Sequence, residues 1–540
     1  MKKLVALLLA VVMLFALVAC GSNPSSNTPN GSDTPSSNTP STPSGDGGQE
    51  IIATGDDLYE KKTPEGEVVF GTNQTIKDMN PTTAQDNSGL WLVYDRLWSL
   101  NAETGEYEPG LATSWEWLDS RTLSVTLRDD VYFHSGDKFV ADDVLYTLER
   151  LTDPLLNTRS LMRWAMIDME ATEVVDDTHI IIRLGTDSGT LMAEFGASCG
   201  AIVNRSHCEA AGEEGFWDNV DGTGPFKLVQ AITGDRQVYE INEKYWGEKP
   251  NFNKVTMRYY GEVATMFIDY ENGDLDGCFG ISAEDAQRVI DGTVDHTSLY
   301  IIPEHRLYYL AIAGYSEPLQ DVRVRQALAY AMDREALASI GFDLLGLPGE
   351  SLIAGGCNYG IPFEGYEYNP DKAIELLKEA GYYNNLTLRL TSNNQAGPSR
   401  MAEAFQAMLD AVGIKLEVGF FDTATHIKNV QGFEYDMSMN SITVDTLDPS
   451  QQWATAERNS GNQIADIRDE EINALLIAAK STPDEAKRAE LYAEFQKLVN
   501  ERCWAVPIVN TCGAVILRDY FEPANITDPR TPNIPDLVLK

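Results

Sequence analysis

The chain has 540 residues, 43% of them hydrophobic and 23% charged, and its 82 acidic and 41 basic residues give a formal net charge of −41. This length predicts about three core-forming units of roughly 100–200 residues each. An acidic surface of this size repels nucleic-acid phosphates, which argues against a nucleic-acid partner.

Residues 1–19 have the features of a signal peptide. A basic start is followed by sixteen apolar residues from Leu4 to Ala19, fewer than the roughly 18 that span a bilayer. The run ends in Leu17-Val18-Ala19-Cys20, which resembles a bacterial lipobox, where cleavage before the cysteine leaves Cys20 as the new N-terminus for lipid attachment. A plain secretory signal with an incidental cysteine is the alternative.

Residues 20–63 are predicted to be a tether. Gly21–Gly48 consists almost entirely of Ser, Asn, Thr, Pro, Gly and Asp, so it has nothing to bury and is expected to be disordered. A flexible chain of this length spans roughly 30 Å. No later apolar run reaches the length of a membrane-spanning helix, so we expect a soluble body on this tether.

The ordered sequence is expected to begin near Pro64, and its first half mixes strands and helices. The patterns predict strands at Val68–Thr72, Thr122–Leu127, Ala201–Val203 and Gln237–Asn242, turns at Asn80-Pro81 and Gly222–Phe226, and helices at Ala141–Leu151, Thr190–Phe195 and Ala264–Ile268.

Two short patterns in this half resemble catalytic or metal motifs. His134 is expected to be a turn residue, because none of the six His is spaced i+3 or i+4 from another and neither H-E-x-x-H nor C-x-x-C occurs. Gly196–Gly200 fits the G-x-S-x-G pattern of serine hydrolases around Ser198. Its predicted flanks are helix before and strand after, the reverse of a nucleophile elbow. We therefore predict no catalytic residue, no metal site and no cofactor.

Tyr308–Ile340 contains a predicted strand, turn and helix. Tyr308–Ala313 is an aromatic and aliphatic run expected to be a buried strand, and Pro318 marks a turn. Asp321 is the expected N-cap of an amphipathic helix that continues through Leu337. Arg323 and Arg325 lie off its apolar stripe and are expected to face solvent or polar partners.

The second half continues the alternation. Helices are predicted from Asn369-Pro370 to Gly381, over Ser399–Val412, and from a capping box at Thr482–Glu485 to Asn500, with strands at Lys415–Phe420 and Ala505–Ile516. Helices alternating with single strands predict an α/β architecture.

Several of these stretches resemble one family. They are PGLATSWEWLDSRTLSVTLRDDVYFHSGDKFVADDVLYTLER at Pro109–Arg150, GTGPF at Gly222–Phe226, KYWGEKP at Lys244–Pro250, and DVRVRQALAYAMDRE at Asp321–Glu335. These motifs and their order along the chain resemble those of the family 5 solute-binding proteins of ABC importers, which capture oligopeptides and dipeptides.

This resemblance implies a two-lobed α/β fold of the type II periplasmic-binding-protein kind. Lobe 1 would comprise residues 64–305 plus 511–540, with an inserted subdomain near 96–219, and lobe 2 residues 306–510.

The resemblance also suggests a binding site. Glu434–Trp453 matches the strand in which peptide binders of the family hold the ligand's ammonium group on an Asp, here Asp445. Two departures weaken a short-peptide assignment: Ile442 replaces the family's usual Trp, and Thr391–Gln395 lacks the Arg that clamps a dipeptide carboxylate. The expected ligand-binding residues are Asp445, Ile442, Thr443, Asn73, Asp86 and Tyr308.

The implied function is capture of a peptide, an oligopeptide rather than a dipeptide, for an ABC permease and its ATPase subunits. We expect a monomer, not an enzyme, held at the outer face of the cytoplasmic membrane by lipid on Cys20. The alternatives are a non-peptide solute such as a nickel chelate or an oligosaccharide, peptide presentation to a signalling receptor, and a secreted serine hydrolase using Ser198.

Six cysteines besides Cys20 leave 15 possible pairings open. Cys199–Cys208 and Cys503–Cys512 are close in sequence, and buried free thiols are the equal alternative. The six are Cys199, Cys208, Cys278, Cys357, Cys503 and Cys512.

Overall fold

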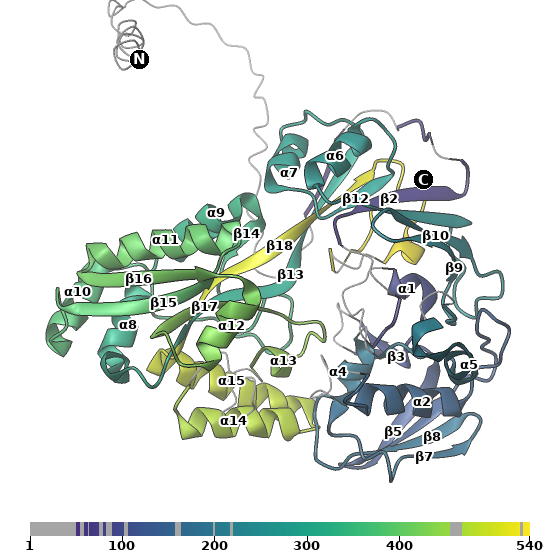
Figure 1. Cartoon of the computed structure of the whole chain (residues 1–540), viewed down its shortest axis with the longest axis horizontal. Coiled ribbons are helices and arrows are strands. Elements are labelled where there is room, and N and C mark those ends of the chain that lie inside the picture. The colour runs from purple at the N-terminus through teal and green to yellow at the C-terminus, as the bar shows by residue number, and fades with distance from the viewer. Residues whose placement is uncertain are drawn as a thin grey trace, which may run out of the picture. The chain divides into compact units, whose positions relative to one another are not determined.

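Two long antiparallel strands, β13 (Thr297–Ile312) and β18 (Ala505–Arg518), lie side by side in the middle of the main sheet (Figure 1). Both are buried along almost their whole length, as expected for nearly continuous runs of aliphatic and aromatic residues. The structure is a computed structural model. It describes residues 50–540 except 55–58, 63, 75–78, 83–88, 102–105, 157–163, 198–199, 216–219, 454–466, 527 and 530–532.

Several predictions fall outside the described residues. These are the signal peptide and most of the tether, the lipid-accepting Cys20, the site residue Asp86, and the pair Ser198 and Cys199. Pro43–Lys540 forms one compact unit.

The main sheet has twelve strands in the order β16-β15-β17-β13-β18-β12-β2-β11-β10-β9, with β1 added to β13 and β14 added to β18. We use lobe 1 for the side of β12 to β9, and lobe 2 for the side of β17 to β16. The remaining strands of the sheet are β1 (Glu50–Thr54), β2 (Glu67–Thr72), β9 (Phe226–Ile232), β10 (Arg236–Ile241), β11 (Lys254–Tyr259), β12 (Gly277–Phe279), β14 (Gly346–Pro348), β15 (Leu386–Asn393), β16 (Ile414–Phe421) and β17 (Met437–Thr443).

Each long strand contributes to the cores of both lobes. Tyr300 and Ile302 of β13 pack in a lobe 1 core, whereas Leu307–Ile312 pack in the lobe 2 core. Between these two stretches the β13–β18 register shifts at Pro303/Arg306, and His305 takes a φ of +50°. The change of core and the bulge therefore coincide.

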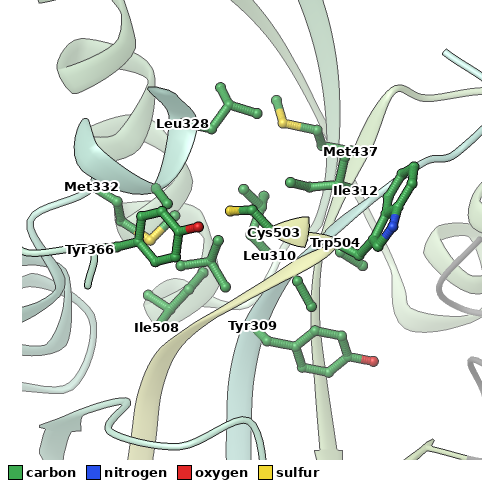
Figure 2. Packing of buried hydrophobic residues seen from close by; sticks show 14 of the residues in the cluster. Tyr309, Leu310, Ile312, Leu328, Met332, Tyr366, Met437, Cys503, Trp504 and Ile508 are labelled. Atoms are coloured by element: carbon green, nitrogen blue, oxygen red, sulfur yellow. The ribbon is translucent and has the colours of Figure 1, made fainter. Parts of the chain in front are cut away.

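Most helices of lobe 2 pack against the apolar residues at the lobe 2 ends of β13 and β18. In Figure 2, Leu310 and Ile312 of β13 pack with Cys503, Trp504 and Met437. The helices are α8 (Val322–Tyr330), α9 (Arg334–Phe342), α10 (Pro370–Ala380), α11 (Ala396–Ala411), α12 (Thr423–Gln431), α13 (Pro449–Trp453), α14 (Glu470–Ser481) and α15 (Glu485–Arg502), with short 3-10 turns η2 (Glu317–Gln320) and η3 (Asp343–Leu345).

Lobe 1 includes a subdomain with its own sheet, in the order β5-β6-β8-β7. Its core is closed by α2, whose buried face includes Val144 and Leu148. The elements here are β3 (Trp98–Leu100), β4 (Tyr107–Pro109), β5 (Ala112–Asp119), β6 (Thr122–Leu127), α2 (Ala141–Thr152), β7 (Glu173–Asp176), β8 (His179–Arg183), α4 (Leu191–Gly196) and α5 (Arg205–Gly215). The rest of lobe 1 adds α1 (Leu90–Val93), α6 (Val263–Glu271), α7 (Ala283–Ile290) and η4 (Ile534–Asp536).

The α/β architecture is confirmed, and so are most of the predicted elements. β2, β6, β10, β16, β18, α2, α4 and α10 match their predictions to within about three residues at each end, with Gly381 in a left-handed conformation after α10. Asp321 caps α8 as predicted, its side chain accepting from the Arg323 N–H.

Arg325 has the second of its two expected environments, polar partners: it is 4% exposed, lies 3.7 Å from the Trp504 ring centroid and donates to the Leu319 carbonyl.

Three local predictions are wrong. The single helix through Leu337 is two helices, because Asp333 caps α9 by accepting from the Ala336 N–H. Ala201–Val203 is not a strand. The N-cap of α15 is Asp484, not Thr482, which instead ends α14.

Cys278, Cys503 and Cys512 are buried free thiols, so Cys503 and Cys512 do not form a disulfide. Cys208 is buried and Cys357 is half-buried, and Cys199 lies outside the described residues, so the pair Cys199–Cys208 stays a prediction. Burial raises the pKa of Cys503 to about 12, which keeps this thiol protonated. No helix in the described part of the chain has the length and apolarity to cross a bilayer.

A buried ion pair fixes the start of α15 against the segment after β17. Arg488 Nη2 lies 2.6 Å from Asp448 Oδ2, with each side chain 4% exposed, and Arg488 Nε donates to the Ala479 carbonyl at 3.0 Å. An ion pair this deeply buried is costly to break from one side, because the remaining charge has no water to solvate it.

We predict that Arg488→Met destabilises the protein by ~3–5 kcal/mol, because it leaves the Asp448 carboxylate buried without its partner. Thermal and urea unfolding measure the loss. The double variant Asp448→Asn/Arg488→Met removes both charges and should recover most of the stability. A single variant as stable as the wild type would contradict this account of the pair.

Candidate ligand-binding site

A cavity of about 950 Å³ lies where the two lobes face each other beside the bulge of β13. β13 contributes Ile302, Pro303 and His305 to its lining. Lobe 2 contributes Gly356 and the segment Asp445, Thr446 and Leu447, and lobe 1 contributes residues from α1 to β4, the Tyr245–Trp246 turn, and residues between Pro523 and Leu537. The cavity is thus enclosed by chain segments that are far apart in sequence.

The lobe 2 wall is held by a dense set of hydrogen bonds. The Asp445 N–H donates to Gln451 Oε1 at 2.9 Å, and Gln451 Nε2 donates back to Asp445 Oδ2 at 3.1 Å. The Leu447 carbonyl accepts from the Asn358 N–H, while the next residue, Asp448, is fixed by Arg488. This wall therefore presents the Asp445 carboxylate in a defined position.

Leu447 has an uncommon backbone conformation, with a φ of +57°. A left-handed conformation at a non-glycine residue costs about 1–3 kcal/mol and persists only where its surroundings enforce it. The bonds on either side of Leu447 supply that constraint. Such strain beside a cavity is typical of a site that is shaped before a ligand arrives.

The lobe 1 wall is built around Asp95, which follows α1. Its carboxylate accepts from Trp246 Nε1 at 2.8 Å, Thr223 Oγ1 at 2.9 Å and Tyr245 OH at 3.2 Å. Burial raises the pKa of Asp95, and these three hydrogen bonds and the neighbouring Arg96 offset part of the rise. The arrangement fixes two aromatic side chains and a negative charge on the same wall.

The glycines of Gly222-Thr223-Gly224 allow this convergence. A Cβ on Gly222 would lie 2.0 Å from the Val93 carbonyl oxygen, and a Cβ on Gly224 would lie 2.6 Å from the Val93 carbonyl carbon. His134 braces the same turn, with Nε2 2.9 Å from the Gly224 carbonyl oxygen, so this histidine is a turn residue as expected. Within the described residues, no group of three or more His, Cys, Asp or Glu could hold a metal ion.

Arg96 faces the protein rather than the middle of the cavity. Its guanidinium lies 4.1 Å from the Trp91 ring centroid and donates to the Gly196 carbonyl. Burial lowers the pKa of Arg96 to about 10, with Asp95 offsetting part of the fall, so the group is charged at neutral pH.

The lobes also touch away from this cavity. The Gly189 N–H of lobe 1 donates to the Lys480 carbonyl of lobe 2 at 2.8 Å. A Cβ on Gly189 would lie 2.1 Å from the Thr482 carbonyl oxygen and 2.6 Å from Arg488 Nε. A smaller cavity of about 200 Å³ adjoins this contact and shares Tyr107 with the large one. The two lobes are therefore in contact at a second place besides the walls of the large cavity.

A family model described as bacterial extracellular solute-binding proteins, family 5 Middle, matches residues 106–463. The chain belongs to this family. Its curated relatives include the dipeptide-binding protein of Escherichia coli K12, 26% identical over 79% of this chain and 85% of the relative. Heme-binding protein A of Haemophilus influenzae is also 26% identical, over 79% of this chain and 83% of the relative.

The solved structure of HbpA2 from Haemophilus parasuis has the same fold. It superposes with a TM-score of 0.79, covering 88% of this chain and 100% of HbpA2 at 22% sequence identity. The two-lobed binding-protein fold expected from the sequence is therefore confirmed.

The structure places one of the predicted site residues, Asp445, on the cavity wall. Ile442 and Thr443 lie just before it in β17, half-buried, with Thr443 Oγ1 accepting from Arg306 Nε at 2.8 Å. Tyr308 is 5% exposed and packs against Phe342 in the lobe 2 core. Asn73 is exposed and lies beside Gly280. These last four are not among the described residues that line the cavity.

The lobe 1 wall is not predicted from the sequence. Thr223, Tyr245 and Trp246 belong to stretches that resemble the family, with no binding role assigned to them, and Asp95 belongs to none of these stretches. The sequence signal that could have found them is the Tyr245-Trp246 pair, since two adjacent aromatics in a polar turn often line a binding site.

We predict that Gly189→Ala weakens the binding of any solute that the wild-type protein holds by about tenfold or more. The added methyl group would collide with the Thr482 carbonyl and so oppose closure, and tenfold corresponds to ~1.4 kcal/mol. Isothermal titration measures the change. Gly185→Ala is the matched control, because a Cβ there would meet only the Met166 carbonyl at 3.9 Å. Equal affinities for the two variants would refute the contact's role.

Proposed function

We propose that this protein captures peptides outside the cytoplasm and delivers them to the permease of an ABC importer. The observation that carries the proposal is the cavity of about 950 Å³ between the lobes, with the Asp445 carboxylate on its lobe 2 wall. A buried ammonium group needs a charged partner and hydrogen-bond acceptors, or its desolvation costs several kcal/mol. Asp445 supplies such a partner for a peptide N-terminus.

The size of the cavity and the missing clamp support oligopeptides over dipeptides. Thr391–Gln395 has no Arg to bind a dipeptide carboxylate bidentately. Ile442 stands where the family usually has a Trp, so the aromatic wall that this Trp provides is absent. The names of the relatives include dipeptide-binding and heme-binding proteins, so the family accommodates different solutes on one fold. A non-peptide solute, such as a nickel chelate or an oligosaccharide, is the alternative occupant, and presentation of peptide to a signalling receptor is the alternative role.

The proposed cycle needs no bond to be made or broken. A ligand can favour the closed form only by binding it better than the open form, which contacts from both walls of the cavity achieve. The closed form would then dock on the permease, and the ATPase subunits would drive release. The competing secreted hydrolase would depend on Ser198, and a fluorophosphonate probe distinguishes the two because only the hydrolase is labelled.

Mass spectrometry of the solute that co-purifies with the protein from a native source tests the function. The expected result is one or more peptides, recovered unchanged after incubation, together with a decrease in the radius of gyration on rebinding to the stripped protein. Recovery of a non-peptide solute would refute the peptide assignment, and steady conversion of the bound solute would refute the binding role.

We predict that Asp445→Asn weakens the binding of peptides with a free N-terminus by about 10–100-fold, because a hydrogen bond to a charged group contributes ~1.5–3 kcal/mol. N-acetylated forms of the same peptides should be much less affected. Isothermal titration of both forms gives the comparison. Asp410→Asn is the control, an exposed carboxylate in lobe 2 away from the cavity. Equal losses for free and acetylated peptides would argue against an ammonium partner.

We further propose that lipid on Cys20 anchors the protein to the outer face of the cytoplasmic membrane. Cys20→Ala is expected to abolish incorporation of labelled palmitate and to move the protein from the membrane fraction to the soluble fraction. Cys357→Ala, which changes a cysteine of the folded body, should leave both properties unchanged. Labelling that persists in Cys20→Ala would overturn the proposal.

A further inference from the structure

The lobe 1 wall gathers negative charge around Tyr245. Asp95 accepts a hydrogen bond from the Tyr245 hydroxyl, and both Asp95 and Asp536 raise the pKa of Tyr245 beyond the effect of its burial. Burial also raises the pKa of Asp536, with a further contribution from the charge of Glu248. Asp95 and Asp536 therefore both lie near Tyr245, Glu248 lies near Asp536, and all three line the cavity.

Negatively charged side chains outnumber positively charged ones among the described residues that line the cavity. Six carboxylate side chains are among the described lining residues, whereas Arg96 is the one Lys or Arg among them. Arg96 contacts the Trp91 ring and the Gly196 carbonyl, and its charge offsets part of that of Asp95 alone. The six are Asp95, Glu108, Glu248, Asp445, Asp528 and Asp536.

The aromatic lining of the same wall also suits a cation. Trp91, Trp98, Tyr107, Tyr245 and Trp246 line the cavity. Two of these rings already hold a guanidinium of the protein itself: Arg96 lies 4.1 Å from the Trp91 centroid and Arg128 lies 4.5 Å from the Trp246 centroid. Aromatic faces attract cations through the ring quadrupole, more strongly where water is excluded. Aromatic rings and carboxylates on one wall are thus complementary to an ammonium or guanidinium group.

We propose that the cleft selects solutes with a positively charged group, held against Asp95, Glu248 and Asp536 beside Tyr245 and Trp246, and rejects anionic ones. The inference rests on the proposed function for the kind of solute, a peptide with its N-terminus at Asp445 and a Lys or Arg side chain directed to the lobe 1 wall. Asp95 acts within the protein wall, where a lower effective dielectric constant strengthens the attraction for cations and the repulsion of anions, whereas Glu248 and Asp536 are exposed and add a contribution that salt screens.

Capture from a chymotryptic digest of casein tests the selection, since such peptides carry basic and acidic residues independently of where they were cut. Peptides retained by the protein at low ionic strength are sequenced by mass spectrometry. The expected result is an enrichment of Lys and Arg over Asp and Glu of about tenfold relative to the digest. The enrichment should fall as salt is raised, because salt screens charges that solvent still reaches.

Variants assign the selection to this wall. Glu248→Gln/Asp536→Asn removes two of the three charges, leaves the hydrogen bonds of Asp95 intact, and should reduce the enrichment to threefold or less. Glu240→Gln/Asp274→Asn changes the net charge equally at exposed positions of lobe 1 outside the cavity lining, and should keep the enrichment. Equal melting temperatures confirm that all three proteins are folded.

The outcomes separate the two proposals. Peptides retained without charge bias, or with a bias that the double variant leaves unchanged, overturn the charge selection while the peptide function stands. If no peptide is retained, the peptide function fails. Retention of spermidine but not of tricarballylate would then uphold the selection for cations, and retention of neither would overturn it.

Discussion

The antiparallel pairing of β13 with β18 is the constraint on which both lobes depend. Each strand is buried in a lobe 1 core at one end and in the lobe 2 core at the other, so one pair of strands joins the two lobes. The ladder is interrupted at Pro303/Arg306, where His305 leaves the extended conformation and Gly356 of lobe 2 approaches its ring. A bulge bends a strand and removes local hydrogen bonds, so deformation is easiest at this point. The large cavity borders the same residues, which places the ligand where a small change in the strands alters both walls.

The two walls are built in different ways, and the difference has an electrostatic consequence. The lobe 2 wall is a local loop, in which Asp445, Leu447 and Asp448 are each fixed by near neighbours or by α15. The lobe 1 wall is assembled around one carboxylate, Asp95, by donors from two later segments of the chain. A carboxylate with three donors remains in place when water leaves, because its hydrogen bonds come from the protein. Its charge, which the neighbouring Arg96 stabilises in part, contributes to the electrostatic potential that a solute meets on this wall.

Much of the fold could be predicted because its signals are local. The alternation of Thr122–Leu127, the Asp321 cap, and the Pro370 start and Gly381 end of α10 each act within a few residues. The sequence left alternatives open where a distant partner decides the outcome. Arg325 was expected to face solvent or polar partners, and it is buried because Trp504 covers its guanidinium, although neither residue indicates the other in the sequence. Asp445 could be placed through a family motif, whereas Asp95 could not, because its role exists only once Thr223, Tyr245 and Trp246 have folded onto it.

Closure links these observations to selectivity. The contact of Gly189 with Lys480 and Thr482 shows that the lobes approach to backbone distance away from the cavity, so contacts between the lobes themselves favour closure. Against these contacts stands the repulsion among the carboxylates that line the cavity, an energy that grows as the effective dielectric constant falls. A solute that carries positive charge removes the repulsion, while a neutral one leaves it and an anion increases it. The charge of the walls therefore determines which solutes can shift the equilibrium toward the closed form. The contacts at Gly189 determine how much of the closed form exists without a solute, and so how much binding free energy the shift requires.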